Sequence, residues 1–245
     1  MRYLPLALFI GGFAARLSAG ALFINNPSFE ANVLSCTPSN TCATFDTVTG
    51  WTGATADPNG FTGPESVSGT FGVYKPSTTS YPTGIPDGVN VAYLFTGSYS
   101  DSISQTLAAD LLANDTYTLT ALVGAPAGGP GCSGFNVSLL AGGNVLNSIT
   151  GEGEFTCVQE TVGTFTKFTV TYTSSANPVG LGDPLQIVLE ANGSGSSIEQ
   201  AEIDFDTIAL SDTLTSSSPT VPEPATLGLV GTALLGLGWW SRKRA

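Results

Sequence analysis

Alternation of apolar and polar residues is the feature that most restricts how this chain can fold. Residues 116–123, 167–172 and 185–190 place Thr, Lys, Gln or Glu between Tyr, Leu, Val, Phe and Ile. A period of two residues, interrupted by Gly, Pro, Asn and Ser, is typical of antiparallel strands with one buried face. Further candidate strands are residues 71–74, 89–95, 101–107, 135–140, 145–149 and 203–210. About ten strands in roughly 190 residues predict an all-β fold, an antiparallel β-sandwich or jelly roll. Only residues 108–114 have a helical pattern, and it is short.

The C-terminal 25 residues have the composition of a membrane segment rather than of a strand. The 17 residues between Pro224 and Arg242 carry no charge and include two adjacent tryptophans. A helix that crosses the hydrocarbon core needs about 20 apolar residues, with about 17 as the lower limit. Basic residues after such a helix stay on the cytoplasmic side. The tail therefore predicts a transmembrane helix. It is preceded by the motif Val221, Pro222, Glu223 and Pro224 and followed by a basic membrane stop, Arg242, Lys243 and Arg244.

The three parts of this tail together resemble the PEP-CTERM sorting signal of bacteria. The resemblance implies export, transient insertion in the inner membrane, and recognition by an exosortase, a membrane cysteine transpeptidase that cleaves near the motif. It then places the protein at the cell surface or in an extracellular polysaccharide matrix. A C-terminal anchor that is never cleaved remains the alternative. The resemblance covers the tail alone and leaves the function of the preceding domain open.

The N-terminus has the composition of a signal peptide. A positive start at Arg2 is followed by an apolar stretch, residues 3–15, and by the small residues Ser18-Ala19-Gly20-Ala21. Ala19 and Ala21 fit a cleavage site, and cleavage after Ala19 or Gly20 fits nearly as well. The predicted organisation is a signal peptide (1–21), a β-sandwich ectodomain (22–211), a Ser/Thr/Pro linker (212–220) and the sorting signal (221–245).

The predicted ectodomain and linker are strongly acidic. They hold 18 of the 19 acidic residues and only two basic ones, Lys75 and Lys167, which gives a formal net charge of −16. A nucleic-acid partner is excluded, because binding to phosphates needs many Lys and Arg side chains. Such a surface attracts cations, although solubility alone also explains the charge.

The four cysteines, Cys36, Cys42, Cys132 and Cys157, are an even number in a chain that we expect to be exported. Disulfides form in such compartments, so we expect the cysteines to be paired. Three pairings are formally possible, and short sequence separation favours Cys36–Cys42 and Cys132–Cys157. A zinc site is not expected, because the chain has no histidine and no CxxC spacing.

Short matches across the ectodomain are similar to galactose-binding-like jelly-roll domains. They include the opening Asn25-Asn26-Pro27-Ser28-Phe29-Glu30, Gly50-Trp51, Pro86-Asp87-Gly88 and the closing Asp204-Phe205-Asp206-Thr207-Ile208. This group includes many carbohydrate-binding modules. The resemblance implies a structural calcium ion between the first and last strands, with Glu30 and Asp206 as ligands. Asp204 lies two residues before Asp206 and so shares its strand face unless a bulge intervenes. Solvent-facing acids at a sheet edge are the alternative.

Catalysis by the common triads is not available to a chain without histidine. No motif selects a carboxylate pair for glycoside hydrolysis, so we expect a protein that is not an enzyme. Three aromatic residues in polar loops, Trp51, Phe61 and Tyr81, are candidates for stacking on sugar rings or for plugging the end of the sandwich. The sequence thus predicts an exported surface or matrix protein with a candidate polysaccharide ligand. The alternatives are a polysaccharide-acting enzyme and a purely structural matrix protein.

Overall fold

The computed structural model describes residues 20–36, 42–56, 71–96, 100–128, 134–151, 162–192 and 201–214. These residues form thirteen strands and no helix. The strands are β1 (Gly20–Leu22), β2 (Ser35–Cys36), β3 (Cys42–Phe45), β4 (Thr52–Ala56), β5 (Phe71–Tyr74), β6 (Val91–Thr96), β7 (Ser100–Asp110), β8 (Asp115–Gly124), β9 (Gly134–Ala141), β10 (Asn144–Gly151), β11 (Phe165–Thr173), β12 (Pro184–Asn192) and β13 (Ala201–Leu214). The predicted antiparallel β-sandwich is confirmed.

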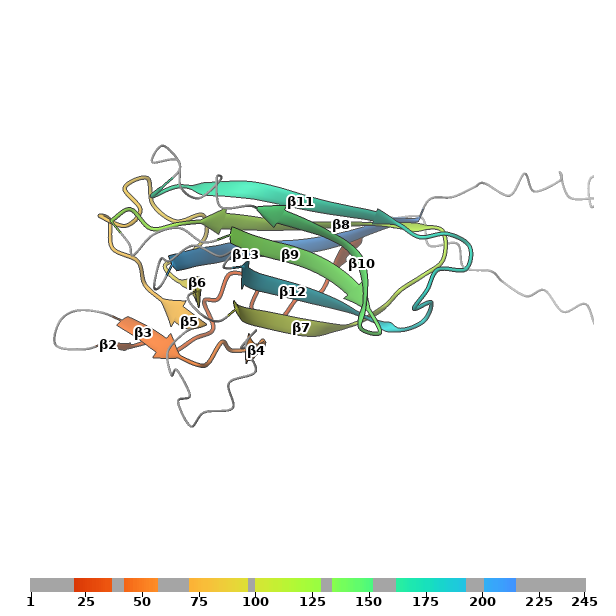
Figure 1. Ribbon diagram of the computed structural model, residues 1–245, viewed down its shortest axis with the longest axis horizontal. Helices are drawn as coiled ribbons and strands as arrows, with labels where there is room; N and C mark the ends of the chain where they lie inside the picture. The colour runs from red at the N-terminus through yellow and green to blue at the C-terminus, as the bar shows by residue number, and fades with distance from the viewer. Residues whose placement is uncertain are drawn as a thin grey trace, which may run out of the picture. The chain divides into compact units, whose positions relative to one another are not determined.

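Two antiparallel layers make up the sandwich (Figure 1). In the first layer the strand order is β2-β3-β5-β6-β13-β8-β11, and in the second it is β4-β7-β12-β9-β10. The layers are joined by the pair Thr96–Ser100, where β6 continues into β7. Strand β13 is central to the first layer, because it pairs with β8 on one side and with β6 and then β1 on the other.

Alternating side chains fill the space between the layers. In β8 the buried residues Tyr117, Leu119, Ala121 and Val123 alternate with three threonines and Leu122, as the sequence pattern predicts. Apolar residues of β9, β12 and β13 complete the core, and the rings of Phe135 and Phe205 lie edge to face with centroids 6.4 Å apart. Full burial of such a side chain contributes about 1.5–3 kcal/mol, so the core provides most of the stability that holds the strands in register.

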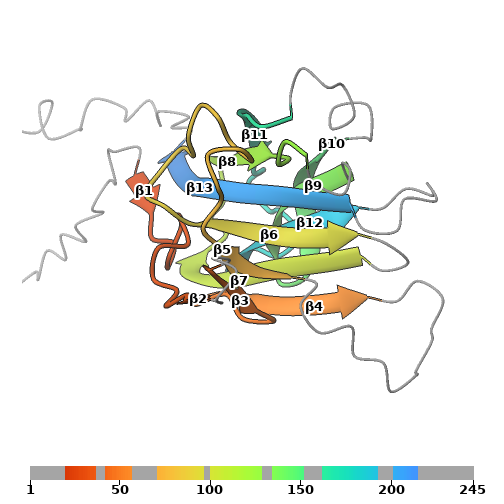
Figure 2. The ribbon, with the colours of Figure 1, turned by 90° about the vertical axis from the view of Figure 1, so that its left-hand side faces the viewer.

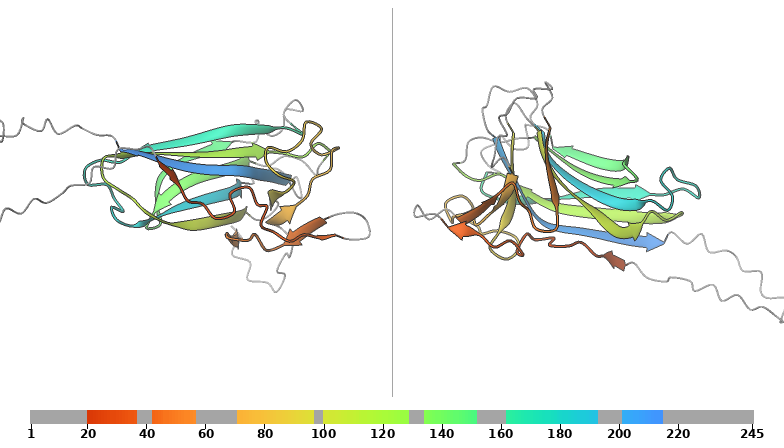
Figure 3. Two further views of the ribbon diagram at one scale, coloured as in Figure 1. Left: turned by 180° about the vertical axis from the view of Figure 1, so that it is seen from behind. Right: turned by 90° about the horizontal axis from the view of Figure 1, so that it is seen from below.

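Two sequence predictions about the strands are wrong. Residues 108–110, expected in a short helix, continue β7, because Asp110 pairs with Pro184 of β12 and tertiary pairing outweighs the local preference of Ala and Leu. Residues 212–214, expected in the linker, belong to β13 and pair with residues 115–117 of β8. The views in Figure 3 show β1 beside the end of β13, where Gly20 pairs with Asp212.

The chain divides into two units, residues 1–214 and 215–245. The predicted signal peptide, apart from Gly20 and Ala21 in β1, and the predicted sorting signal lie outside the described residues. Within the described residues, the structure contains no helix with the length and apolar character needed to cross a bilayer. Cys36 lies opposite Cys42 in the register of β2 and β3, whereas Cys132 and Cys157 lie outside the described residues. Both cysteine pairings stay predictions.

Candidate active site

A row of three acidic residues lies on one face of β13. Ile203 and Phe205 point into the core, so the alternation of the strand directs Glu202, Asp204 and Asp206 to the opposite face. All three acids are nevertheless buried, with exposed fractions of 9% for Glu202 and 0% for Asp204 and Asp206. A row of buried carboxyl groups is costly unless the groups are protonated or hydrogen-bonded, which makes it a candidate functional site.

Residues 75–90, which connect β5 to β6, cover this face of the first layer (Figure 2). The amide of Ala127 donates to the carbonyl of Ser80 (2.9 Å), and the ring of Tyr81 stacks on Phe165 with centroids 4.6 Å apart. The amide of Asp87 donates to Oδ2 of Asp206 (3.0 Å). The covering segment is thus attached to β11, to β13 and to the residues that follow β8, and it brings Tyr81 onto the acidic row.

Two tyrosines hold one oxygen of Asp204. The hydroxyl of Tyr74, at the end of β5, donates to Oδ2 of Asp204 at 2.8 Å, and the hydroxyl of Tyr81 donates to the same atom at 2.5 Å. The other oxygen, Oδ1, is buried and has no hydrogen-bond partner. Because Oδ2 already accepts two hydrogen bonds, a proton on this carboxyl group resides on Oδ1.

The surroundings of Asp204 favour its protonated form. Burial raises the pKa of Asp204 well above its ordinary value, the nearby Glu202 raises it further, and the hydrogen bonds from the two tyrosines lower it only in part. Burial also raises the pKa of Glu202. The pKa values of Tyr74 and Tyr81 are raised by burial and then by the charge of Asp204, so both phenols remain donors. The arrangement is therefore a buried carboxylic acid whose conjugate base has two hydrogen-bond donors.

Asp206 has a different environment from Asp204. Its Oδ2 accepts from the amide of Asp87 and its Oδ1 from the amide of Thr207 (2.6 Å). Burial raises its pKa to about 7, against the effect of these hydrogen bonds. Thr207 has a φ of 49°, and a bulge follows in the pairing with β8, which returns Ile208 to the core. Both oxygens of Asp206 are thus engaged in holding the backbone.

The proposed metal ligands are not gathered in one place. Glu30 accepts from the amides of Val89 (2.8 Å) and Asn90 (2.7 Å), and the described residues contain no group of three or more acidic or cysteine side chains that could hold a metal ion. Asp204 is committed to the tyrosines. Glu30 and Asp206 both bind residues 87–90, and Oδ1 of Asn90 is buried without a partner, so this segment offers oxygen atoms of the kind that calcium prefers. Calcium binding by Glu30 and Asp206 stays a prediction.

Two of the three loop aromatics, Trp51 and Tyr81, are buried. Trp51 is 8% exposed, its Nε1 donates to the carbonyl of Asn26 (3.2 Å), and its ring lies against Phe29. Tyr81 is 1% exposed and bound to Asp204. For these two side chains the structure favours the alternative that they fill the interior. Phe61 lies outside the described residues, and binding of a glycan by any of the three stays a prediction.

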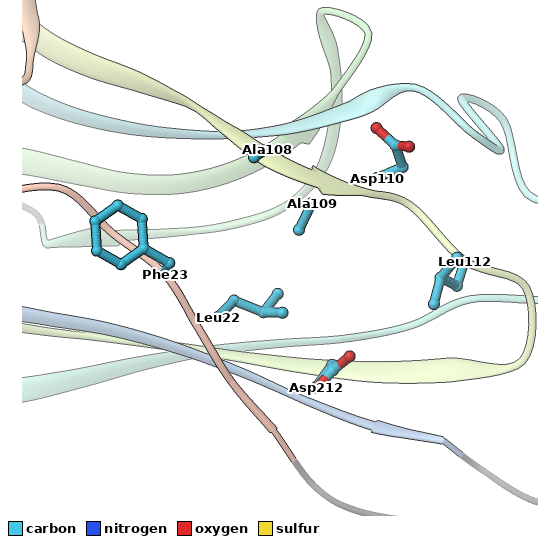
Figure 4. Close-up of a pocket in the computed structure, with 7 residues that line it drawn as sticks. All are labelled: Leu22, Phe23, Ala108, Ala109, Asp110, Leu112 and Asp212. Carbon is cyan, nitrogen blue, oxygen red and sulfur yellow. The ribbon is translucent and has the colours of Figure 1, made fainter. Parts of the chain in front are cut away.

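Two hollows are lined by described residues alone. One, of about 290 Å³, is lined by Tyr81 and by residues of the covering segment on either side of it, including Lys75 and Ile85. The other, of about 520 Å³, lies between β1, β7 and β13, with Asp110 and Asp212 among apolar side chains such as Leu22 (Figure 4). Asp212 is eight residues from Asp204 along β13, which is roughly 26 Å of strand. Only the first hollow is therefore next to the buried acid.

Comparisons with known proteins place the chain in an enzyme family. The model of the family described as HpiC1 cyclase matches residues 20–211, so the chain belongs to the HpiC1-like family. The PEP-CTERM protein-sorting motif matches residues 220–243, which confirms the sorting signal. The chain is thus an exported protein that an exosortase processes. A search of curated proteins found no match.

Among solved structures, the chain is similar to the Stig cyclase FisC from Fischerella sp. TAU in complex with (3Z)-3-(1-methyl-2-pyrrolidinylidene)-3H-indole. The identity is 29% over 81% of this chain and 100% of that chain, with a TM-score of 0.65. A cyclase from the same organism in complex with 4-(1H-indol-3-yl)butan-2-one is 29% identical over 81% and 100%, with a TM-score of 0.62. A carbohydrate-binding module, TmCBM61 in complex with β-1,4-galactotriose, is 15% identical over 77% and 97%, with a TM-score of 0.45.

These findings overturn the expectation that the protein is not an enzyme. That expectation depended on the absence of histidine, but a protonated carboxyl group in a dry site can also transfer a proton. Sequence patterns single out Asp204 and Tyr81 in other roles, and they single out neither Tyr74 nor Glu202. The alternation Glu-Ile-Asp-Phe-Asp at 202–206 was a usable signal, since acids that alternate with core residues must share a face.

Proposed function

We propose that the protein is an exported cyclase in which Asp204 starts the reaction by donating a proton. The observation that carries this proposal is the carboxyl group of Asp204, fully buried, with Tyr74 and Tyr81 both on Oδ2 and no partner on Oδ1. Membership of the HpiC1-like family supports the reaction class.

The geometry suits a proton donor whose charged product must be stabilised. When Oδ1 gives up its proton, the negative charge spreads to Oδ2, where two phenol hydroxyls already donate. Donors fixed in a buried site stabilise developing charge without reorganisation. The proton adds to an unsaturated carbon of the substrate, and an internal π bond attacks the resulting cation to close the ring. The carboxylate of Asp204 then takes a proton from another carbon, which gives an isomer of the substrate and restores the acid. No redox cofactor is needed for this sequence.

The proposed substrate is apolar and aromatic. Stacked and edge-on rings surround the acid, since Tyr81 lies on Phe165 and Tyr74 lies against Tyr93. Such ring faces stabilise a carbocation as well as an apolar ring. The Fischerella cyclases are similar to this chain and their structures contain indole compounds, which supports an aryl-alkene substrate such as an alkenyl indole.

A glycosidase that uses Glu202 and Asp204 as its carboxylate pair is not favoured. Such enzymes place two carboxyl groups about 5–9.5 Å apart on either side of a sugar linkage. Glu202 and Asp204 lie two residues apart on the same face of one strand, so the two carboxyl groups are neighbours and do not face each other across a cleft.

A substrate panel with matched variants tests the proposal. The full-length protein in detergent is incubated with 3-alkenyl indoles and related aryl alkenes, and isomers of unchanged mass are separated by chiral chromatography. Wild type is expected to form a cyclic isomer, and Asp204→Asn is expected to lose activity by about 100-fold or more, as for the loss of a general acid. Asp110→Asn, a change of an exposed acid at the other end of the domain, is the control. Full activity of Asp204→Asn would refute the assigned role.

A further inference from the structure

The first strand brings the main-chain nitrogen of Gly20 to a carboxylate. Strand β1 pairs with the end of β13, with Gly20 opposite Asp212 and Leu22 opposite Leu210. The Gly20 nitrogen donates to Oδ1 of Asp212 at 3.1 Å. A Cβ at Gly20 would lie 3.0 Å from the same oxygen, so a residue with a side chain would crowd the carboxylate. The glycine thus lets Asp212 approach the backbone closely.

Asp212 occupies the inner face of its strand. It lies opposite Tyr117 of β8, just as Leu210 lies opposite Leu119, and facing residues of an antiparallel pair share one face of the sheet. Leu210, Tyr117 and Leu119 are all in the core. Asp212 is half-buried there and lines the hollow between β1, β7 and β13 (Figure 4). A carboxylate at the end of a core face is costly unless a hydrogen-bond donor or a cation compensates it.

The described residues around Asp212 supply negative charge and no cation. Asp115 of β8 is fully buried, and its pKa is raised by burial and further by the charge of Asp212. The basic side chains among the described residues are Lys75 and Lys167. Lys167 pairs with a residue of β8 that is five positions, or roughly 17 Å, from the partner of Asp212. Lys75 follows β5, whose last residue binds Asp204. Neither lysine is therefore placed to neutralise the two acids.

We propose that the predicted signal peptide is removed after Ala19 and that the new N-terminal ammonium group of Gly20 forms an ion pair with Asp212. Hydrolysis of the bond between Ala19 and Gly20 takes up one water molecule and leaves a carboxylate on Ala19 and an ammonium group on Gly20. An α-amino group is largely protonated at neutral pH. Its nitrogen is the atom that already lies 3.1 Å from Oδ1, so the ion pair needs no rearrangement of β1.

The other two cleavage positions would damage the pairing of β1. Cleavage after Ala21, which the A-x-A pattern fits, would remove two of the three residues of β1, including the nitrogen that binds Asp212. Cleavage after Gly20 would also remove that nitrogen. Cleavage after Ala19 keeps the whole strand, and the match to the family model also begins at residue 20. The pairing of β1 thus favours one of the three positions that the sequence leaves open.

Sequencing of the N-terminus of the exported protein tests the cleavage position. The full-length chain is expressed in a bacterium with a functional export pathway and extracted from the envelope in detergent. Its first residues are then determined by N-terminal sequencing and mass spectrometry. Gly20 is the expected first residue. A chain that begins at any other residue, Leu22 included, or that keeps its predicted signal peptide, would overturn the proposal.

Melting of two matched chains in detergent tests the ion pair. One chain begins at Gly20 and runs to Ala245, and the other carries two added serines before Gly20, which move the ammonium group away by roughly 7 Å. Asp212→Asn keeps an oxygen that can accept from the Gly20 nitrogen but removes the charge. We expect this substitution to lower the melting temperature of the chain that begins at Gly20 by roughly 2 °C more than that of the extended chain, as for a partly exposed ion pair.

Asp110→Asn is the control for this comparison, because Asp110 is an exposed acid that lines the same hollow. Its substitution should change the melting temperatures of the two chains by nearly the same amount. If Asp212→Asn also changes both chains equally, the ion pair is overturned, even where Gly20 is the first residue of the exported protein.

Discussion

Replacement of Asp204 by asparagine provides a direct test of the protonation state on which the site depends. Asparagine has nearly the shape of a protonated aspartic acid, and its side-chain oxygen can accept the hydrogen bonds from Tyr74 and Tyr81 at 2.8 and 2.5 Å. We therefore expect the variant to fold and to keep the contacts of the covering segment.

The expected magnitude follows from proton linkage. The pKa of Asp204 is raised in the folded protein well above its ordinary value of 3.8, so the folded state binds a proton that the unfolded state has lost. The contribution of this group is fully present at pH values below the unfolded pKa and is lost as the pH rises toward the folded pKa. Each pH unit in that window removes about 1.4 kcal/mol from the free energy of unfolding. Between pH 5 and pH 7 the loss is at most about 3 kcal/mol by the same relation.

Denaturant unfolding at pH 5, 6 and 7 measures this effect as the difference between wild type and Asp204→Asn. Asparagine does not titrate, so wild type should lose stability relative to the variant as the pH rises, while Asp110→Asn should run parallel to wild type. Asp206 titrates in both proteins, so its contribution largely cancels in the difference. Glu202 interacts with Asp204, so the difference reports the two carboxyl groups together. A constant difference over this range, or wild type gaining stability on the variant, would show that Asp204 is ionised and would refute the assignment of a neutral acid.

Three further predictions concern the surroundings of the acid. Tyr81→Phe removes one of the two donors to Asp204, and we expect a loss of about 1–3 kcal/mol in transition-state stabilisation, measured as kcat/KM, with normal folding by circular dichroism. An unchanged kcat/KM would contradict the role of Tyr81. Gly88→Ala should destabilise the protein strongly, because a Cβ there would lie 2.2 Å from Oε1 of Glu30 at a φ of 62°. Gly84→Ala should lower the free energy of unfolding only by the backbone strain of about 1–2 kcal/mol, because φ there is 85° and no atom lies within 4 Å of the added Cβ. Equal melting temperatures of Gly88→Ala and Gly84→Ala would refute this reasoning. Calcium should raise the melting temperature of wild type more than that of Glu30→Gln, since an ion bound only to the folded state stabilises by mass action. Melting temperatures that are the same in calcium as in chelator would end the calcium hypothesis.

Local sequence patterns were sufficient for much of the architecture. The alternation in residues 116–123 and 167–172 predicts strands that the structure contains as β8 and β11, because a half-buried strand must present one apolar face. The sorting signal was also readable, since its motif, apolar stretch and basic end are contiguous in the sequence and need no tertiary contact. The extension of β7 through residues 108–110 was not, because it depends on pairing with β12.

The site was decided by tertiary structure. In the sequence, Tyr74 and Tyr81 are 130 and 123 residues from Asp204, and nothing local indicates that both hydroxyls reach one carboxylate oxygen. Tyr81 lies in a polar segment that predicts exposure, but the segment folds back over β13 and buries the ring. The neighbours of a residue along the chain determine whether it lies in a strand and which face of the sheet it takes. The chemistry of Asp204 depends on the segment that covers this face, and only long-range packing places that segment there.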